Sequence, residues 1–326
     1  MKFLPDQVVA RLQMEMQTPD LSGTRYRAFK LLGHGGMGAV WLAEDSVLQR
    51  AVALKILSAE NSSADMAARL MQEAVILARL EHPGIVPVHD AGTLPDGRTF
   101  YCMKYVEGET LDRHMEDLPI RQRLQLFQRI AEPLAFAHAR GIVHRDLKPG
   151  NVMVGAFGEV LVMDWGLAKI VADAEGKASS QSLPARMAYS ALTSHGTVLG
   201  TPGFMAPEQE RGDVTMIDQR TDVFGLGSIL RYMLGGPAGT VSGASPSKQL
   251  QAICQKAMAA EMAQRYSSVQ ELAADIGKYL DGMPVRAYRE NIFERMIRLI
   301  NRNRVAVVLI LAYLLMRVVF ILFSRR

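Results

Sequence analysis

One stretch near the middle of the chain combines an acid, a cation and an amide at close spacing. Within residues 144–151, HRDLKPGN, Asp146 supplies a proton acceptor, Lys148 a cation for a phosphate and Asn151 an oxygen ligand for a metal. Asp164 adds a carboxylate further along, directly after an apolar run. These residue types at these offsets favour a site for phosphate and metal chemistry.

A glycine cluster near the N-terminus adds a second phosphate signal. Residues 33–40, GHGGMGAV, match G-x-G-x-x-G-x-V, in which missing side chains let backbone N–H groups approach phosphate oxygens. A dinucleotide-binding fold needs a helix after these glycines, whereas residues 40–43 have the pattern of a strand. A G-K-[ST] sequence is missing as well, so a P-loop is excluded. A glycine-rich hairpin over a nucleotide remains.

Lys55 and Glu73 form the third element of this chemistry. Lys55 ends an otherwise apolar strand pattern over residues 52–54, so its ammonium group must point into a site or pair with an acid. Glu73, on the helix predicted next, is the partner we expect. The alternative is an exposed ion pair that contributes under about 1 kcal/mol.

Hydrophobic periodicity predicts the elements that hold these residues. Alternation over residues 26–57 predicts a hairpin-rich sheet, and a helical run that follows residues 61–63 ends before His82. The pattern then predicts a strand over 99–106, helices over 111–140 and 250–280, a loop-rich region over 144–208 and a loop over 235–247.

Together with Ala206-Pro207-Glu208, the order and spacing of these motifs resemble the protein kinase superfamily. The resemblance extends from about Tyr26 to Ala287 and is closest to the bacterial Ser/Thr kinases of eukaryotic type, also called Hanks-type kinases. It implies an α+β, bilobal fold, with a small antiparallel β-sheet lobe that carries one main helix and a larger, mostly helical lobe. Lys148 and Thr201 look like the Ser/Thr-specific branch, so protein Ser and Thr hydroxyls are the implied acceptors.

The resemblance also implies the catalytic roles. Lys55 corresponds to the lysine that holds the α and β phosphates of ATP, and Glu73 to the acid that fixes this lysine. Asp146 corresponds to the residue that orients the substrate hydroxyl and accepts its proton, and Lys148 to the one that steadies the transferred phosphoryl group. The chemistry is positioning and charge neutralisation.

The implied cofactors are ATP and Mg²⁺, with Mn²⁺ as an alternative metal. Asn151 and Asp164 match the family's metal ligands, and their oxygens suit a hard cation that keeps water and phosphate in its shell. The implied nucleotide-binding positions are Leu32, Gly33, His34, Gly35, Gly36, Met37, Gly38, Val40, Ala53, Lys55, Met103, Tyr105, Val106 and Met153.

Three further residues are structural by the same resemblance. Glu208 and Arg265 match a buried ion pair, and Asp222 matches the acid that braces the catalytic loop from below.

The sequence departs from the family pattern at two places in the site. Trp165 replaces the usual Phe of the metal-binding triplet, and must pack between the helix of Glu73 and His144. The region that follows Asp222 is short where the family has a substrate-docking helix. These departures motivate the alternative of a pseudokinase that acts as an ATP-binding scaffold. A small-molecule phosphotransferase is disfavoured by Thr201 and the motif at 206–208.

Residues 164–208 form a long segment rich in hydroxyl side chains. Arg145 is placed to pair with a phosphate there, so we expect autophosphorylation, with a homodimer that reacts in trans left open. A Ser-rich loop without a switch is the alternative. The hydroxyl-bearing positions are Ser179, Ser180, Ser182, Thr193, Ser194 and Thr197.

The expected domain plan has four parts. Residues 1–24 form an N-terminal extension and 25–287 the kinase domain, divided into a small lobe, 25–106, and a large lobe, 107–287. A basic juxtamembrane segment, 288–304, precedes a transmembrane helix over 305–323, which is apolar except for Tyr313 and Arg317. A buried or in-plane helix is the alternative for that segment, because a central Arg opposes spanning.

Composition sets the remaining expectations. The chain has 326 residues, 49% of them hydrophobic, which is enough for two compact lobes. Its two cysteines give neither a disulfide framework nor a zinc signature. The net charge of +4 is assigned to an anionic membrane surface and not to nucleic acid. Arginines gather on the N-terminal side of residues 305–323, which predicts a single-pass protein of the inner (cytoplasmic) membrane with its kinase domain in the cytoplasm.

Overall fold

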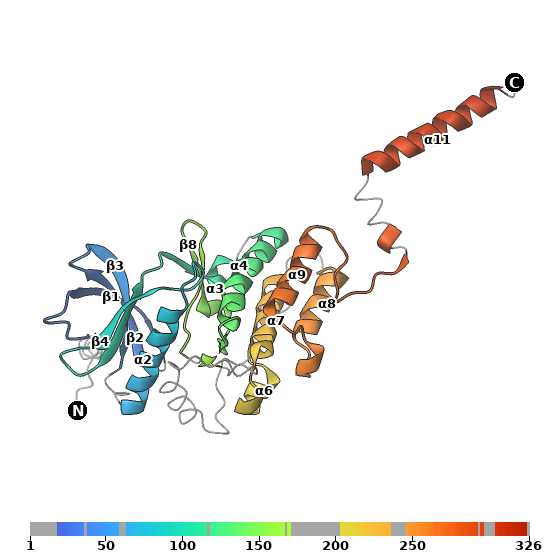
Figure 1. Ribbon diagram of the computed structural model, residues 1–326. Helices are drawn as coiled ribbons and strands as arrows, with labels where there is room; N and C mark the ends of the chain where they lie inside the picture. The colour runs from blue at the N-terminus through green and yellow to red at the C-terminus, as the bar shows by residue number, and fades with distance from the viewer. Residues whose placement is uncertain are drawn as a thin grey trace, which may run out of the picture.

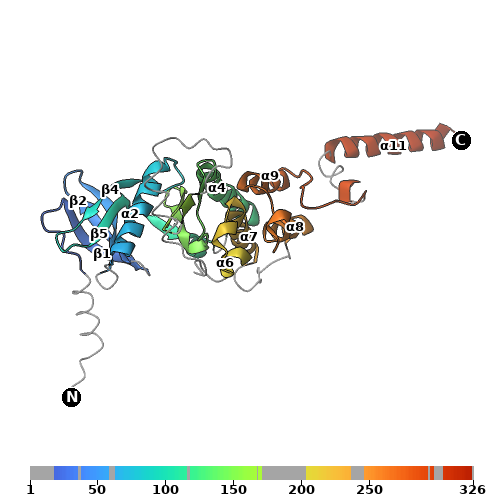
Figure 2. The same cartoon turned by 60° about the horizontal axis from the view of Figure 1, so that its bottom comes forward.

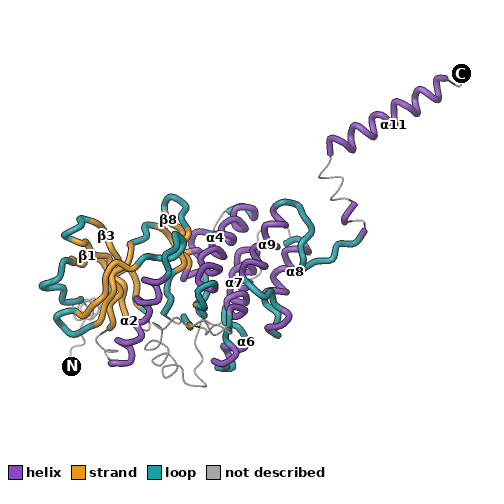
Figure 3. The backbone as a smooth tube through the Cα atoms, viewed as in Figure 1, coloured by secondary structure: helices purple, strands orange, loops and turns teal. Residues whose placement is uncertain are grey.

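Two lobes of different composition make up the body of the molecule. The computed structural model describes residues 18–35, 38–58, 63–115, 118–166, 168–170, 203–235, 246–292, 294–296 and 304–324. In Figures 1 and 3 the long strands gather at the N-terminal end and most helices at the other. The predicted bilobal α+β fold is confirmed.

The small lobe is built on one antiparallel sheet. Its strand order is β1-β2-β3-β5-β4, and every neighbouring pair is antiparallel, which confirms the predicted hairpin-rich sheet. The strands are β1 (Tyr26–His34), β2 (Gly38–Asp45), β3 (Arg50–Leu57), β4 (Val88–Thr93) and β5 (Thr99–Lys104).

Strand register separates the two faces of this sheet. Lys55 lies opposite Val40 on one side and Tyr101 on the other, and Ala53 lies opposite Met103. Because directly paired residues share a face and alternate residues along a strand do too, all five side chains point to the same side. The register therefore places the Lys55 cation among the uncharged side chains of Val40, Ala53, Tyr101 and Met103.

Helix α2 (Ala64–Arg79) packs against the sheet and carries Glu73. Ser63 caps it, because the Ser63 hydroxyl accepts a hydrogen bond from the Met66 N–H, and such caps contribute about 0.5–2 kcal/mol. The buried residues lie at helical spacing, so one face turns inward. They are Leu70, Glu73, Ala74, Ile76 and Leu77.

The large lobe contains more helices and more short strands than expected. The predicted helical region over 111–140 is divided into α3 (Leu111–His114) and α4 (Ile120–His138). The region over 250–280 contains α8 (Lys248–Ala257) and α9 (Val269–Leu280), and α7 (Gln219–Gly235) lies before them. The interpretation of 144–208 as loop was incomplete. It holds β8 (Val152–Gly155), β9 (Val160–Val162) and β10 (Lys169–Ile170), which pair with β6 (Gly108–Thr110) and β7 (Ile142–Val143).

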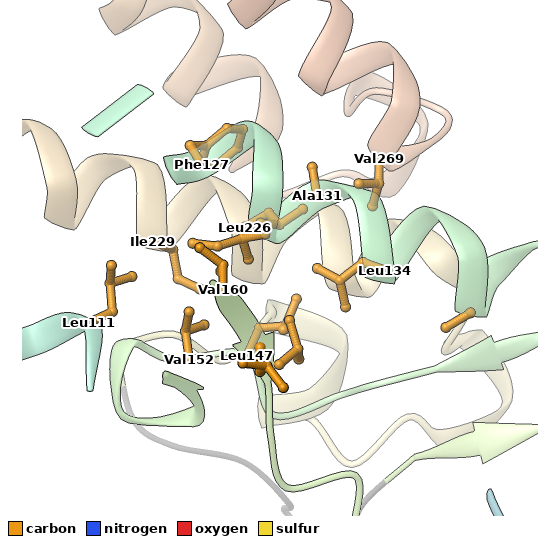
Figure 4. Packing of buried hydrophobic residues seen from close by; sticks show 14 of the residues in the cluster. Leu111, Phe127, Ala131, Leu134, Leu147, Val152, Val160, Leu226, Ile229 and Val269 are labelled. Atoms are coloured by element: carbon orange, nitrogen blue, oxygen red, sulfur yellow. The ribbon is translucent and has the colours of Figure 1, made fainter. Parts of the chain in front are cut away.

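The large-lobe core holds the catalytic loop from below. Phe127 and Leu134 of α4 pack with Leu226 and Ile229 of α7, and all four are fully buried (Figure 4). Leu147, next to Asp146, belongs to the same cluster and is 3% exposed. Burial of Leu147 therefore fixes the backbone beside Asp146.

A buried ion pair ties helix α6 (Pro207–Glu210) to the end of the lobe. The two terminal guanidinium nitrogens of Arg265 donate to the Glu208 carboxylate at 2.8 Å, and the Thr221 hydroxyl donates to it at 2.9 Å. Burial alone would raise the pKa of Glu208, but Arg265 holds it below the ordinary value. The predicted Glu208–Arg265 pair is confirmed.

Helix α11 (Arg304–Ser324) covers the predicted membrane segment and lies apart from the two lobes (Figures 1 and 2). Within the part of the chain that the structure describes, no helix has both the length and the apolar character of a membrane span. The transmembrane assignment for 305–323 is thus not confirmed. The hydroxyl-rich positions 179–197, Thr201 and most of the predicted loop at 235–247 lie outside the described residues.

We predict that Arg265→Met lowers the free energy of unfolding by about 3–5 kcal/mol at neutral pH, because it leaves a buried carboxylate without its partner. Equilibrium unfolding in urea measures this difference in the free energy of unfolding. Arg220→Met is the matched control, since Arg220 and Asp218 form a half-exposed pair and its loss costs under about 1 kcal/mol.

The same pair predicts a dependence on pH. Because the pKa of Glu208 is lowered on folding, the pair stabilises the protein above the ordinary value of 4.5 and this contribution is lost as pH falls below it. The difference between wild type and Arg265→Met must therefore shrink in acid. Equal losses for Arg265→Met and Arg220→Met would contradict the argument.

Candidate active site

Three charged side chains from different elements converge between the lobes. The Lys55 ammonium lies 2.8 and 2.9 Å from the two Glu73 carboxylate oxygens and 2.9 Å from an Asp164 oxygen. The side chains of Lys55 and Glu73 are 13% and 0% exposed, so the alternative of a surface ion pair is wrong. The Tyr101 hydroxyl adds a hydrogen bond of 2.8 Å to Glu73.

This arrangement keeps the charges needed to bind a phosphate and a metal. Burial would lower the pKa of Lys55, but Glu73, Tyr101 and Asp164 raise it well above its ordinary value. Burial would raise the pKa of Asp164, but Lys55, and after it His144 and Lys148, lower it. At neutral pH the site therefore holds an ammonium beside ionised carboxylate.

The catalytic loop brings the other charged residues together. The Lys148 ammonium lies 2.9 Å from an Asp146 carboxylate oxygen. The Asn151 amide donates to the same oxygen at 3.1 Å and to the Asp146 carbonyl at 2.8 Å, from the one-turn 3-10 helix Pro149–Asn151. Two donors on one oxygen hold the Asp146 carboxylate in a single orientation.

Asp222 of α7 braces this loop, as predicted. Its carboxylate accepts hydrogen bonds from the backbone N–H groups of His144 at 2.8 Å and Arg145 at 2.9 Å, and contacts His138 Nε2 at 2.7 Å. Although burial raises the pKa of Asp222, these contacts lower it below the ordinary value. The brace supports Arg145 at a φ of 74°, a left-handed conformation that is costly for a residue with a side chain.

Trp165 is accommodated in place of the expected Phe. It is fully buried in the same cluster as Leu77 of α2, and its ring centroid lies 4.6 Å from that of His144. The indole N–H donates to the Val162 carbonyl at 3.3 Å. The predicted packing against His144 is confirmed, and Asp164 before it takes a left-handed φ of 58° that aims its carboxylate at Lys55.

The predicted adenine-binding residues line one apolar cluster. Ala53, Met103 and Val106 are buried, and Val40 and Met153 are half-buried against them. Tyr105 is half-buried after β5, and Leu32 is 41% exposed on β1. An apolar surface with backbone groups at its edge suits a planar base.

The glycine-rich hairpin closes with two backbone hydrogen bonds. The Gly35 N–H donates to the Gly38 carbonyl at 2.8 Å, and the Gly38 N–H donates back at 3.2 Å. A Cβ atom on Gly38 would collide with the Ile56 carbonyl of β3, so this position requires glycine. Gly33 and His34 end β1, whereas Gly36 and Met37 lie outside the described residues.

The donor set fits ATP with Mg²⁺. Asp164 supplies a carboxylate and Asn151 a carboxamide, and Mg²⁺ needs one or two protein ligands with phosphates and water. Within the described ranges no group of three His, Cys, Asp or Glu residues could hold a metal ion by itself. Asp164 and Asn151 would leave the other positions around a metal to phosphate and water oxygens.

Three residues of this site were missed in the sequence. Tyr101 was detectable, because it lies two positions before Met103 and so on the same strand face. His138 and Gln209 gave no local signal, because each contacts a partner far away in the sequence.

The comparisons with known proteins agree with this geometry. Residues 26–306 match the protein kinase domain family. The serine/threonine-protein kinase PknD of Chlamydia trachomatis is 35% identical across 80% of this chain, and PknD of Chlamydia felis is 34% identical across 80%. The chain spans about a third, 32% and 31%, of the length of these two relatives.

A solved structure shows the same fold. The Mycobacterium tuberculosis PknI kinase domain superposes with a TM-score of 0.56 at 28% identity, covering 78% of this chain and 95% of that domain. The chain therefore belongs to the protein kinase family, with relatives among the bacterial Ser/Thr kinases of Hanks type.

Proposed function

We propose that this chain is an active Ser/Thr protein kinase, which transfers the γ-phosphoryl group of ATP to Ser and Thr hydroxyls of proteins. The observation that carries the proposal is the assembled set of charges: Lys55 contacts both Glu73 and Asp164, while Asp146 lies hydrogen-bonded to Lys148 and Asn151. Each side chain to which we assign a charge for phosphoryl transfer thus has a partner within hydrogen-bonding distance, which supports the proposal.

The proposed roles are those that the family resemblance implies, and these contacts support them. Lys55 binds the α and β phosphates, and Glu73 holds the ammonium in place so that little reorganisation is needed. Asp146 orients the substrate hydroxyl and accepts its proton, while Lys148 beside it neutralises charge on the transferred group. Asp164 and Asn151 hold Mg²⁺ or Mn²⁺, which neutralises the phosphate oxygens when bound.

Two alternative functions fit the structure less well. An ATP-binding scaffold requires only the nucleotide pocket, and gives no reason for the oriented Asp146 carboxylate. A small-molecule phosphotransferase gives no reason for helix α6, in which Glu208 is tied to Arg265 beside the catalytic loop. The relative PknD is named as a serine/threonine-protein kinase, which supports protein hydroxyls as acceptors.

The proposal extends to regulation by autophosphorylation. Arg145 belongs to the catalytic loop, and residues 171–202, outside the described residues, hold the Ser and Thr candidates. We expect a phosphate on one of these hydroxyls to pair with the Arg145 guanidinium and so to order the segment. A homodimer that reacts in trans is part of this proposal.

The proposal also includes attachment to the inner (cytoplasmic) membrane through α11, with the kinase domain in the cytoplasm. Consecutive apolar side chains at 308–311 and 314–316 are 49–67% exposed, so they cover every face of the helix. A helix that is apolar on all sides must be buried against something, and a bilayer is the partner that fits.

Labelled γ-phosphate from ATP–Mg tests the kinase activity. We expect incorporation on Ser and Thr by the wild-type chain, and a loss of about 10²- to 10⁴-fold in Asp146→Asn, which removes the proton acceptor. Asp281→Asn, at an exposed position after α9, is the control and keeps full activity. Mass spectrometry of the product locates the phosphosites. Absence of incorporation by a wild-type chain that binds ATP would favour the scaffold instead.

Flotation with lipid vesicles tests the attachment. The wild-type chain is expected to float with anionic vesicles, and Leu311→Asp with Leu315→Asp to remain unbound, since each buried charge costs about 2.5–3.5 kcal/mol. Phe157→Asp is the control and is expected to float. Phe157 lies in the turn between β8 and β9, away from α11, and its side chain is 99% exposed. A wild-type chain that stays at the bottom of the gradient rules out the membrane proposal.

A further inference from the structure

The side chain of Gln209 joins the catalytic loop to helix α6. Its Nε2 donates to the Arg145 carbonyl oxygen at 2.6 Å, and its Oε1 accepts from the Ala206 N–H at 3.1 Å. Gln209 is only 4% exposed, so both hydrogen bonds are sheltered from water. One buried amide thus bridges two segments that lie far apart in the sequence.

The first of these contacts holds the peptide group that leads into Asp146. The Arg145 carbonyl belongs to that peptide, and Arg145 has a left-handed φ of 74°. Asp222 holds the peptide group before Arg145 through its N–H at 2.9 Å, and Gln209 holds the one after it. The strained residue is therefore fixed on both sides. On the side of Asp146, Gln209 holds the carbonyl of the peptide group, and His144 Nδ1 accepts from its N–H at 3.2 Å.

The second contact anchors the bridge on rigid structure. Ala206 directly precedes α6, and the neighbouring Glu208 is held by Arg265 at 2.8 Å. A small cavity lies between α6 and the catalytic loop, with Asp146, Phe204 and Thr221 among its lining residues. Gln209 also lines this cavity, and its amide links the two walls through the hydrogen bonds to Ala206 and Arg145.

We propose that Gln209 is a positioning residue for phosphoryl transfer: it sets the orientation of Asp146 relative to residues 203–206. The inference rests on the proposed kinase function. The bridge between the Arg145 carbonyl and the Ala206 N–H requires a donor and an acceptor on one side chain. Met matches the length of Gln without either group, and an ionised Glu accepts but does not donate.

Steady-state kinetics on the full chain test this role. Gln209→Met is expected to lower kcat about ten- to a hundredfold, as small misplacements of catalytic groups do, with the KM for ATP changed less than about twofold. Gln219→Met is the matched control, because exposed Gln219 also donates to a carbonyl, that of Ser267 at 2.8 Å, away from the site. Its kcat stays at the wild-type value.

The pH profile of Gln209→Glu separates positioning from general destabilisation. An ionised Glu would face the Arg145 carbonyl with a like partial charge, whereas a protonated Glu donates as Gln does. The ratio of kcat for Gln209→Glu to that of wild type therefore rises as pH falls from about 8 to about 6, while the ratio for Gln209→Met stays flat.

The possible outcomes are distinct. An active wild type with an unchanged kcat in Gln209→Met, or a flat ratio for Gln209→Glu, overturns the positioning role alone. A folded wild-type chain that transfers no phosphate at all overturns the proposed function, and this inference with it.

Discussion

Lys55 of β3 is the charge at which side chains from the two lobes meet. Lys55 comes from the sheet and Glu73 from α2, both in the small lobe, whereas Asp164 follows β9 in the large lobe. A buried ammonium is tolerated only when acids surround it, so the sheet register, the orientation of α2 and the left-handed turn at Asp164 must agree. The acids that stabilise the Lys55 ammonium also hold it in position for a phosphate, and one of them, Asp164, is the proposed metal ligand.

The buried acids of the large lobe are also surrounded by hydrogen-bond donors or by a cation. Asp222 is satisfied by two backbone amides and His138, and Glu208 by Arg265 and Thr221. Neither acid contacts the reacting groups that we assign. They fix the catalytic loop and α6, and the apolar core around Phe127 and Leu226 supports both (Figure 4). Buried polar contacts at the base of the site thus fix the positions of the catalytic residues.

Much of this arrangement could be predicted from the sequence, for physical reasons that differ by element. Period-two alternation around Lys55 predicted the sheet, and helical spacing around Leu70 predicted α2, because both patterns are local and long. Strands β8 and β10 were missed because they are too short to show a period. Gln209 was missed because its proposed role depends on a hydrogen bond to Arg145, which is distant in the sequence, and no local pattern predicts such a contact. The tail at 305–323 was predicted to span a membrane on hydropathy alone, and the fold does not confirm this.

Single-turnover transfer of the γ-phosphoryl group by Glu73→Gln tests the central claim most directly. The neutral amide keeps the shape of Glu73 but removes the charge that holds Lys55. The account predicts a fall in the transfer rate of about 10²-fold, with ATP still bound. The variant keeps Lys55 in the site, but the lysine loses its fixed position. A transfer rate equal to that of wild type would show that the buried pair does not organise the chemistry, and would contradict the account.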